Sequence, residues 1–346
     1  MKGGSSMRNV KKMLLVLCVF LMIAMLLGAC SAKGREVVIY TSVDQVFAED
    51  ILREFEEETG IKVKPVFDVE ATKTVGLANR VIAEKDKPQA DVFWSGEFIM
   101  TIVLANEGVL TPYASPSAND IPAIYKDPDN LWTGYAGRAR VIFVNTDLLS
   151  PSEYPTSIFD FLDPDRDPSQ MAIAQPMFGT TMTQAAALYA YLGEEEARDF
   201  YEQLKARGVK VVDGNSVTRD MVAAGQVAFA LTDTDDACTS VNKGDPVKVI
   251  IPDQDAMGTL VIPNTVAMVK GGPNPEEAKV LIDYLLTKEM EKKLIERGWS
   301  HIPVRPIDIE TDCIPRGEIK NMNVTFEEIF NYRDMVNQQM IEIFVK

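Results

Sequence analysis

Five short polar clusters carry most of the binding chemistry that this sequence offers. Each falls where an apolar, strand-like run ends and a helical pattern begins. The clusters comprise residues 41–44, 94–97, 179–181, 214–216 and 232–236. In a parallel α/β sheet such junctions gather at one edge, where the N-termini of helices converge on a ligand. We therefore expect the five clusters to outline one binding cleft.

The last cluster is the most unusual, because it holds three carboxylates in five positions. Like charges this close destabilise a fold unless a cation, a basic side chain or water compensates them. Asp44, Asp235 and Asp236 would supply the oxygen donors that ferric iron, magnesium or calcium accept. Carboxylates facing Arg138 or Lys73 would equally suit a zwitterion such as an aminophosphonate, or an anionic phosphate compound. The sequence does not choose between these ligands.

The same residues also have an ordinary structural interpretation. Ser, Thr, Asp and Asn are favoured N-cap residues, and Asp233 followed by Asp236 has the spacing of a capping box. Trp94, at the end of an expected strand, fits the core as well as it fits stacking on a ligand. His301 follows an expected helix, where we expect a solvated loop. The binding hypothesis therefore rests on the clusters taken together.

The motifs of common enzymes are missing from the sequence. It has no Walker-type glycine loop, nucleophile elbow, His-Glu-x-x-His zinc helix or Rossmann glycine fingerprint. His301 is the single histidine, which removes most general-base and zinc-site arrangements. A hydrolase that uses the aspartates would need a metal-activated water and a base. We therefore expect a binding protein without catalytic residues and without a required cofactor, in which ferric iron would be a ligand.

The first 30 residues have the pattern of an export signal. Basic residues up to Lys12 precede an apolar run over residues 13–27, which is too short to span a bilayer comfortably. The run ends in Leu27-Gly28-Ala29-Cys30, which resembles the lipobox of a bacterial lipoprotein signal. This resemblance implies that residues 1–30 form the signal, with Cys30 as the lipidation point. We expect an extracytoplasmic protein of the cell envelope, anchored to the membrane by lipid rather than by a helix.

Charge and cysteine content narrow the range of partners further. Lysine and arginine total 35 against 51 acidic residues. Four of the basic residues and none of the acidic ones precede residue 31, so the remainder carries a formal charge of about −20. Such a polyanion repels nucleic acid. Beyond Cys30 the chain has two cysteines, Cys238 and Cys313, which could form a disulfide, although the sequence cannot show that they are close.

Strand-like and helix-like segments alternate along the chain, which is typical of an α/β fold with a parallel-rich sheet covered on both faces. A helix with Phe47, Ile51 and Phe55 on one face is expected to end at Gly60. A later helix opens at Asn274 with the spacing of a capping box to Glu277. The expected strands are residues 37–40, 61–67, 91–94, 140–144, 172–174, 210–212, 227–231 and 247–251.

Six segments, taken in order, carry a resemblance to a known family: residues 38–42, 55–63, 90–94, 137–141, 214–217 and 224–225. They resemble the extracellular solute-binding proteins of ABC importers, in the ferric-iron-binding branch of the type 2 periplasmic binding proteins. The resemblance implies two Rossmann-like α/β lobes joined by hinge crossovers near residues 134–140 and 253–259. Lobe 1 would comprise residues 31–137 and 258–300, and lobe 2 residues 138–257 and 301–346.

The resemblance also implies where a ligand would lie. In the ferric branch two adjacent tyrosines, a histidine and a glutamate hold the iron; these positions correspond to Asp235, Asp236, Asp44 and Gly96 in this sequence. The iron-binding side chains are therefore not reproduced. The anion-binding turn of that branch corresponds to residues 136–138, which keep its glycine and arginine but lose its hydroxyl. The ligand thus stays open between a metal ion, a metal–anion complex and a phosphonate or organophosphate compound.

We expect the two lobes to close on the ligand and to present it to an ABC permease and its ATPase. The protein would act as a monomer that binds a small ligand and no nucleic acid. A binding protein coupled to a sensor, or a metal-dependent hydrolase, are the less favoured alternatives. The expected ligand-binding residues are Ser42, Asp44, Lys73, Trp94, Glu97, Gly137, Arg138, Thr180, Thr181, Asn215, Asp233, Asp235 and Asp236, and Asp44, Asp235 and Asp236 are the expected metal ligands.

Overall fold

The structure, a computed structural model, describes residues 34–67, 75–177, 179–309, 313–314 and 319–346. The expected signal over residues 1–30, its lipidation point Cys30 and the expected ligand contact Lys73 lie outside the described residues. Within the described part of the chain, no helix has the length and apolar character that spanning a membrane requires.

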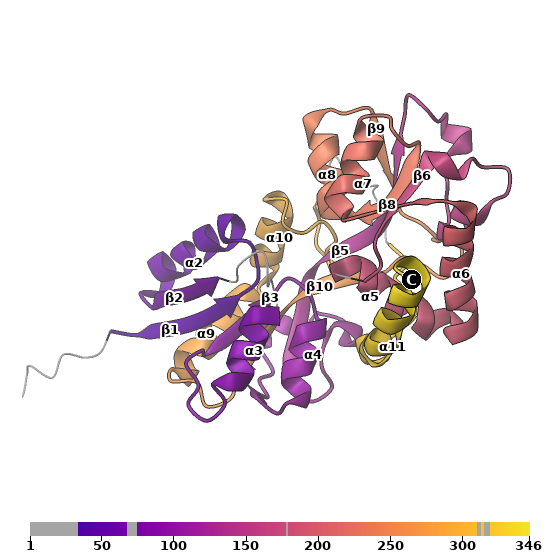
Figure 1. The fold of residues 1–346 in the computed structure, drawn as a ribbon. Helices are drawn as coiled ribbons and strands as arrows, with labels where there is room; N and C mark the ends of the chain where they lie inside the picture. Colours follow the sequence, from indigo (N-terminus) through magenta and orange to yellow (C-terminus); the bar gives the residue numbers. More distant parts are fainter. Residues whose placement is uncertain (1–33, 68–74, 178, 310–312, 315–318) are drawn as a thin grey trace, which may run out of the picture.

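Two α/β lobes lie side by side, and the strand β5 (Trp132–Asn145) belongs to the sheets of both (Figure 1). The other strands of the first lobe are β1 (Glu36–Thr41), β2 (Lys62–Phe67), β3 (Val92–Ser95), β4 (Leu110–Thr111) and β10 (Val261–Val269). Those of the second lobe are β6 (Met171–Ala174), β7 (Lys210–Val212), β8 (Phe229–Asp233) and β9 (Val247–Ile250). The strand order along the molecule is β2-β1-β3-β10-β5-β8-β6-β7.

Helices cover the faces of both sheets (Figure 1). The first lobe carries α2 (Gln45–Thr59), α3 (Val75–Ala83), α4 (Ile99–Asn106), α9 (Pro275–Leu285) and α10 (Lys288–Glu296). The second lobe carries α5 (Gly179–Leu192), α6 (Glu194–Arg207), α7 (Asn215–Ala223) and α8 (Thr234–Lys243), and the C-terminal helix is α11 (Phe326–Phe344). Short 3₁₀ turns form at Pro116–Ala118, Ala123–Tyr125, Pro151–Glu153, Ile158–Leu162 and Pro168–Gln170.

The strand β5 carries the chain from one lobe to the other. Its residues up to Ala139 pair with β10, and its residues from Arg140 onward pair with β8. Just before this change of partner, Ala136 adopts a left-handed backbone with φ of 47°, and the register against β10 shifts between Pro263 and Asn264. A bulge of this kind bends a strand and re-aims the side chains beside it.

The predicted α/β class is confirmed, and the predicted parallel pairing holds for the outer strands. β1 pairs in parallel with β2 and β3, and β6 pairs in parallel with β7 and β8. The centre differs, because β10 and β5 pair antiparallel with each other and with their neighbours. These two strands connect the lobes in opposite directions, which requires the antiparallel arrangement.

The helix ends follow the sequence in one place and depart from it in another. Gly60 ends α2 in the left-handed conformation, as predicted. The capping box predicted at Asn274 is wrong, because its side chain makes no capping bond. Its Nδ2 instead donates to Oδ2 of Asp91 at 2.9 Å, and Glu277 pairs with Arg35. The buried Asp91 carboxylate requires donors and takes this one from the start of α9.

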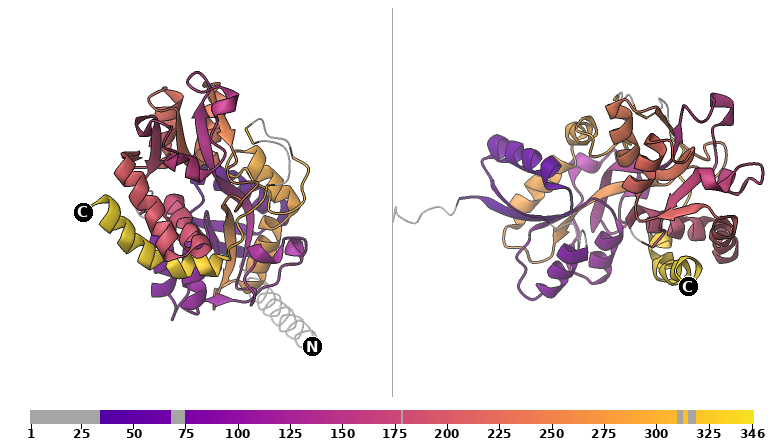
Figure 2. Two further views of the ribbon diagram at one scale, coloured as in Figure 1. Left: turned by 90° about the vertical axis from the view of Figure 1, so that its right-hand side faces the viewer. Right: turned by 45° about the horizontal axis from the view of Figure 1, so that its top comes forward.

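The helix α11 contacts both lobes. At its first residue, the ring of Phe326 packs 4.3 Å from that of Phe98, beside α4. Further along, the hydroxyl of Tyr189 in α5 donates to Gln339 at 2.6 Å. Figure 2 shows α11, in yellow, running along α5 and α6. A long C-terminal helix therefore joins the lobes on a surface separate from β5.

Gly137 is a position where β5 cannot carry a side chain. A Cβ there would lie 2.6 Å from Cγ1 of the buried Val261 and 3.3 Å from the carbonyl oxygen of Ile302. We predict that Gly137→Ala lowers the free energy of unfolding by about 1–3 kcal/mol, as overpacking does. Urea denaturation followed by circular dichroism measures the change.

The matched control is Gly214→Ala, because φ of Gly214 is −172° and its Cβ would meet no atom within 4 Å. Gly214 is the N-cap residue of α7, where Ala is less favoured than Gly, so the effect on the free energy of unfolding should stay below about 1 kcal/mol. Equal effects of the two substitutions would contradict the assignment of Gly137 to a close backbone approach.

Candidate functional site

A cavity of about 310 Å³ lies between the lobes. One wall comes from the ends of β1 and β3, the other from β6, the starts of α5 and α7 and the end of β8, and Arg138 of β5 stands between them. The lining residues are Ser42, Gly96, Glu97, Arg138, Ala174, Gln175, Gly179, Thr180, Thr181, Asp213, Gly214, Asn215, Asp233 and Trp299. The strand-to-helix junctions of both lobes therefore meet at one place.

The expected site residues fall into groups in the structure. Those that line the cavity are Ser42, Glu97, Arg138, Thr180, Thr181, Asn215 and Asp233. Asp235 and Asp236 lie in the first turn of α8 and are not among the lining residues. Trp94 and Gly137 do not line the cavity. Trp94 is 0% exposed in the core of the first lobe. The carbonyl oxygen of Gly137 accepts backbone hydrogen bonds from residues 301 and 302. Asp44 is the N-cap residue of α2 and is not among the lining residues of this cavity.

Each of the three clustered aspartates is paired with an arginine. Asp233 pairs with Arg140, Asp235 with Arg138 at 3.1 Å, and Asp236 with Arg219 at 2.8 Å. The carboxylate oxygens of the three aspartates also lie within 4.8 Å of one another. The compensating positive charge that the sequence required is therefore supplied by guanidinium groups.

Arg140 holds the starts of two helices in place around Asp233. Its guanidinium is fully buried, and Nη1 donates to Thr180 of α5 at 3.3 Å and to Asn215 of α7 at 3.1 Å. Thr180 Oγ1 and Asn215 Nδ2 in turn donate to Oδ2 of Asp233 at 2.5 and 3.0 Å. The alternative interpretation of Asp233 as part of a capping box does not hold, because its carboxylate accepts these donors and makes no cap of α8.

The hydrogen bonds around Arg140 and Asp233 fix part of the cavity wall. The N-terminal turns of α5 and α7, fixed by Arg140, both lie in the cavity wall. The N–H groups of a first helical turn have no partner within the helix, and the helix dipole places partial positive charge there. This wall is therefore suited to negatively charged oxygen atoms.

Arg138 connects the two walls. Its Nη2 donates to the carbonyl oxygen of Gly96 at 2.7 Å, while Nη1 pairs with Asp235. The indole of Trp299 lies 5.5 Å from its Cζ, within the range of a cation–π contact. Burial alone would raise the pKa of Asp235, but the adjacent guanidinium of Arg138 holds that pKa below its ordinary value. Asp235 therefore stays ionised at neutral pH.

Glu97 caps a helix at the cavity edge. Its carboxylate accepts hydrogen bonds from the backbone N–H groups of Ile99 and Met100, at 2.5 and 3.1 Å, and so caps α4. Burial raises the pKa of Glu97, although these donors and Arg138 act in the opposite direction. Glu97 also lines the cavity.

Sequence reasoning missed Trp299, Gln175, Asp213 and the role of Arg140. Trp299 Nε1 donates to Oδ1 of Asn264 at 2.7 Å, and Phe47 packs 5.3 Å from its ring. Asn264 also bonds Ser300 and the carbonyl of the bulged residue Ala136, so Trp299 is fixed to the point where β5 bends. A tryptophan in a glycine- and proline-flanked loop was the available signal.

His301 differs from the expectation of a solvated loop. It is buried beside β5, where its backbone N–H donates to the carbonyl oxygen of Gly137 at 3.0 Å. Burial lowers its pKa to about 4, although the charge of Asp235 opposes this shift. The imidazole is therefore neutral at physiological pH.

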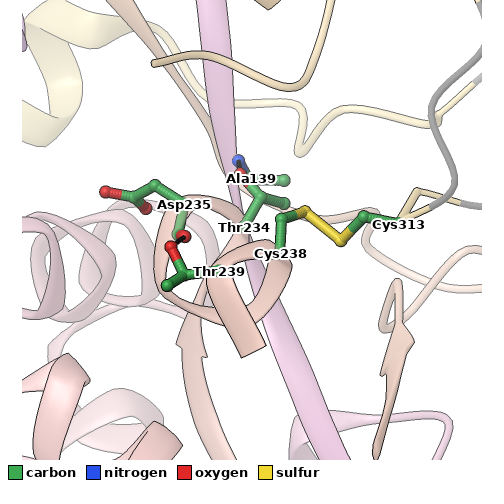
Figure 3. Close-up of a disulfide and its surroundings, with 6 residues drawn as sticks. All are labelled: Ala139, Thr234, Asp235, Cys238, Thr239 and Cys313. Atoms are coloured by element: carbon green, nitrogen blue, oxygen red, sulfur yellow. Dashed lines mark hydrogen bonds between the residues drawn. A yellow bond between two sulfur atoms is a disulfide. The ribbon is translucent and has the colours of Figure 1, made fainter. Parts of the chain in front are cut away.

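Cys238 of α8 and Cys313 form a disulfide, which answers the question that the sequence left open. Figure 3 shows the bridge on α8, with the Asp235 side chain extending away from it. The hydroxyl of Thr234 accepts a hydrogen bond from the backbone N–H of Ala139 at 3.2 Å, so the start of α8 is also held against β5. The first turns of α8, which carry Asp235, are thereby held from two sides.

A family model for bacterial extracellular solute-binding proteins matches residues 37–292. The chain belongs to this family. It is therefore a solute-binding protein of a transport system rather than an enzyme, and it falls in an extracellular or periplasmic class.

Relatives of this chain are named for different ligands. The major ferric iron-binding protein of Neisseria meningitidis serogroup B is 25% identical over 292 residues, covering 80% of this chain and 83% of the relative. A putative 2-aminoethylphosphonate-binding periplasmic protein of Salmonella typhimurium is 26% identical over 255 residues, covering 72% of each chain. As members of ABC import systems, such proteins work with a membrane permease and carry a small ligand.

Solved structures confirm the two-lobed fold of type 2 periplasmic binding proteins. Iron-bound HitA from Pseudomonas aeruginosa matches with a TM-score of 0.76 at 22% identity, covering 88% of this chain and 99% of that one. AfuA from Actinobacillus pleuropneumoniae, with exogenous fructose-6-phosphate bound, matches with a TM-score of 0.72 at 22% identity, covering 91% and 99%.

Asp236 gives a pH-dependent prediction. Burial, together with the charges of Asp235 and Asp233, raises its pKa from 3.8 to about 7, against the opposing effect of Arg219. The folded protein therefore binds a proton more tightly than the unfolded chain. The stability that this supplies is complete below about pH 4 and is lost as the pH rises through about 7. We predict that Asp236→Asn flattens this decline and makes the protein more stable than the wild type at pH 8.

Urea unfolding at half-unit steps between pH 4 and pH 8 measures this difference. Asp220→Asn is the control, because Asp220 pairs with the same Arg219 at 2.8 Å but has a side chain that is 68% exposed. The control should leave the slope of stability with pH unchanged. A lower stability of Asp236→Asn than of the wild type at pH 8 would count against the raised pKa.

Proposed function

We propose that this protein is the solute-binding component of an ABC importer for a small anionic or zwitterionic solute, of the phosphonate or phosphate ester class. The observation that supports this best is the charge arrangement at the cavity. The three clustered aspartates are paired with arginines, while Arg138 and the starts of α5 and α7 line the wall.

The donors around the cavity match such a ligand. Ser42, Thr180 and Thr181 bring hydroxyl groups, and Arg138 brings a planar guanidinium, which suits phosphate-type oxygens. The cavity volume lies in the lower part of the range for small-molecule sites. One relative is named for 2-aminoethylphosphonate, and one similar structure holds fructose-6-phosphate.

A zwitterionic ligand fits the remaining charges. Asp213 is exposed at the cavity rim, on the side of α7, and offers a carboxylate to an ammonium group. An aminophosphonate could thus place its phosphonate at the helix starts and its amine at this rim. This division of the site follows the general preference of anions for helix N-termini.

Ferric iron is the second candidate, favoured by the close approach of the carboxylate oxygens of Asp233, Asp235 and Asp236 and by the names of several relatives. Under this alternative iron is a transported ligand rather than a cofactor. A metal ion at this position would have to replace arginine partners, because each carboxylate already accepts from a guanidinium. That cost is our reason for placing the anionic solute first.

The cellular setting belongs to the same proposal. Lipid attachment at Cys30 would hold a monomer at the outer face of the membrane, beside its permease and ATPase. The lobes would be divided as predicted, with residues 31–137 and 258–300 closing against residues 138–257 and 301–346. Asp44 and Lys73 stay predicted contacts of a closed, ligand-bound form.

Thermal-shift and calorimetric titration of the chelator-treated protein would test this function. We expect 2-aminoethylphosphonate or a small phosphate ester to raise the melting temperature, and ferric citrate to leave it unchanged. Arg138→Gln should weaken binding by about 10–100-fold, the usual loss for a hydrogen bond to a charged group.

The matched control is Arg219→Gln, which removes a guanidinium from the same cluster but not from the cavity wall. This variant should change the affinity for the ligand by less than about threefold, which is much less than the loss of a hydrogen bond to a charged group would cause. A melting temperature that rises with ferric salts and not with any phosphorus compound would replace the first candidate by the second.

A further inference from the structure

The guanidinium of Arg138, which lines the cavity, already donates to two acceptors of the protein itself. Asp235 accepts from Nη1 at 3.1 Å, and the carbonyl oxygen of Gly96 accepts from Nη2 at 2.7 Å. Arg138 lines the cavity, whereas Asp235 does not. The carboxylate thus pairs with the arginine that an anionic ligand would have to use, without itself lining the cavity.

The contact between these two side chains is incomplete. One hydrogen bond joins the two side chains. Nε of Arg138 and Oδ1 of Asp235 are buried and have no hydrogen-bond partner among the described residues. The most favourable pairing of a guanidinium with an oxyanion uses two parallel N–H donors. One nitrogen of Arg138 and one oxygen of Asp235 are therefore unused in this arrangement.

The helix that carries Asp235 is held in place. The Cys238–Cys313 disulfide and the contact of Thr234 with Ala139 fix α8, and Figure 3 shows the Asp235 side chain pointing away from the bridge. If Asp235 leaves Arg138, it must do so by rotating its own side chain. Its neighbours Asp233 and Asp236 keep their own arginines, so the exchange involves one carboxylate.

We propose that Asp235 is an internal competitor for Arg138, and that it limits the affinity of the site for anions. This inference rests on the proposed function, since it assumes that the ligand brings a negatively charged group to Arg138. Because Nε of Arg138 is buried, a ligand oxyanion that enters from the cavity would pair with Nη1 and Nη2 together, and to do so it must displace the carboxylate of Asp235 from Nη1. Asp235 therefore selects for ligands that are stronger acceptors than a single carboxylate.

The test is calorimetric titration of the full chain, in detergent, with inorganic phosphate and with 2-aminoethylphosphonate. Asp235→Asn keeps the shape of the side chain and removes its charge. We expect it to tighten binding of both compounds by about tenfold or more, as the loss of a charged competitor implies. A gain in affinity cannot arise from damage to the fold. Should the Asn variant fail to fold, Asp235→Ser replaces it.

Asp236→Asn, titrated alongside at pH 8.5, is the matched control. Above its pKa of about 7 Asp236 is ionised, so the variant removes a full charge from the next residue of α8 but frees Arg219 instead of Arg138. Titrations at low salt and at about 0.5 M salt separate contact from distant repulsion, which salt screens. The proposal requires that the effect at Asp235 exceed that at Asp236 and persist in high salt.

Three outcomes would overturn the proposal. Equal tightening by both variants that disappears in high salt would reduce the effect to general repulsion. Weaker binding by Asp235→Asn, with a wild type that binds, would make Asp235 a ligand contact and leave the proposed function intact. Failure of the wild type and of both variants to bind either compound would reject the proposed function together with the inference.

Discussion

The buried pair of Arg140 and Asp233 is the interaction on which the binding wall depends. Loss of one partner from a buried ion pair costs about 3–5 kcal/mol, because the other charge is left unpaired. Here the loss would extend further, since the same two groups hold Thr180 and Asn215 at the starts of α5 and α7. The charge pair thus converts separate strand-to-helix junctions into a single surface.

The strand β5 places this pair beside the cavity-facing arginine. Residues 138 and 140 are two positions apart, so their side chains leave the same face of the strand. Arg138 lies in the part of β5 that pairs with β10, and Arg140 begins the part that pairs with β8. The lobes are therefore joined at a residue that lines the cavity and at one that organises its wall. Under the proposed function, motion between the lobes and occupancy of the site would act on the same few residues.

Much of the fold was predictable from the sequence, because it depends on local patterns. Apolar runs located the outer strands, and Gly60 marked the end of α2. The first half of β5 was not predicted, since its glycines at 134 and 137 are unfavourable in strands and are required there only by close packing between distant segments. β10 and α11 were also not predicted. The junction residues of the cavity were foreseen as a group, but their ion pairs were not, because a sequence does not show which arginine meets which aspartate.

Trp299 gives the molecule a built-in optical reporter. The chain has three tryptophans, and of these Trp94 and Trp132 are buried away from the cavity lining, whereas Trp299 forms part of it. Its indole lies against the guanidinium of Arg138 and against Phe47, so any solute that moves that guanidinium changes the electric field at the ring. Intrinsic fluorescence of the unlabelled protein would thus follow loading of the cleft in real time.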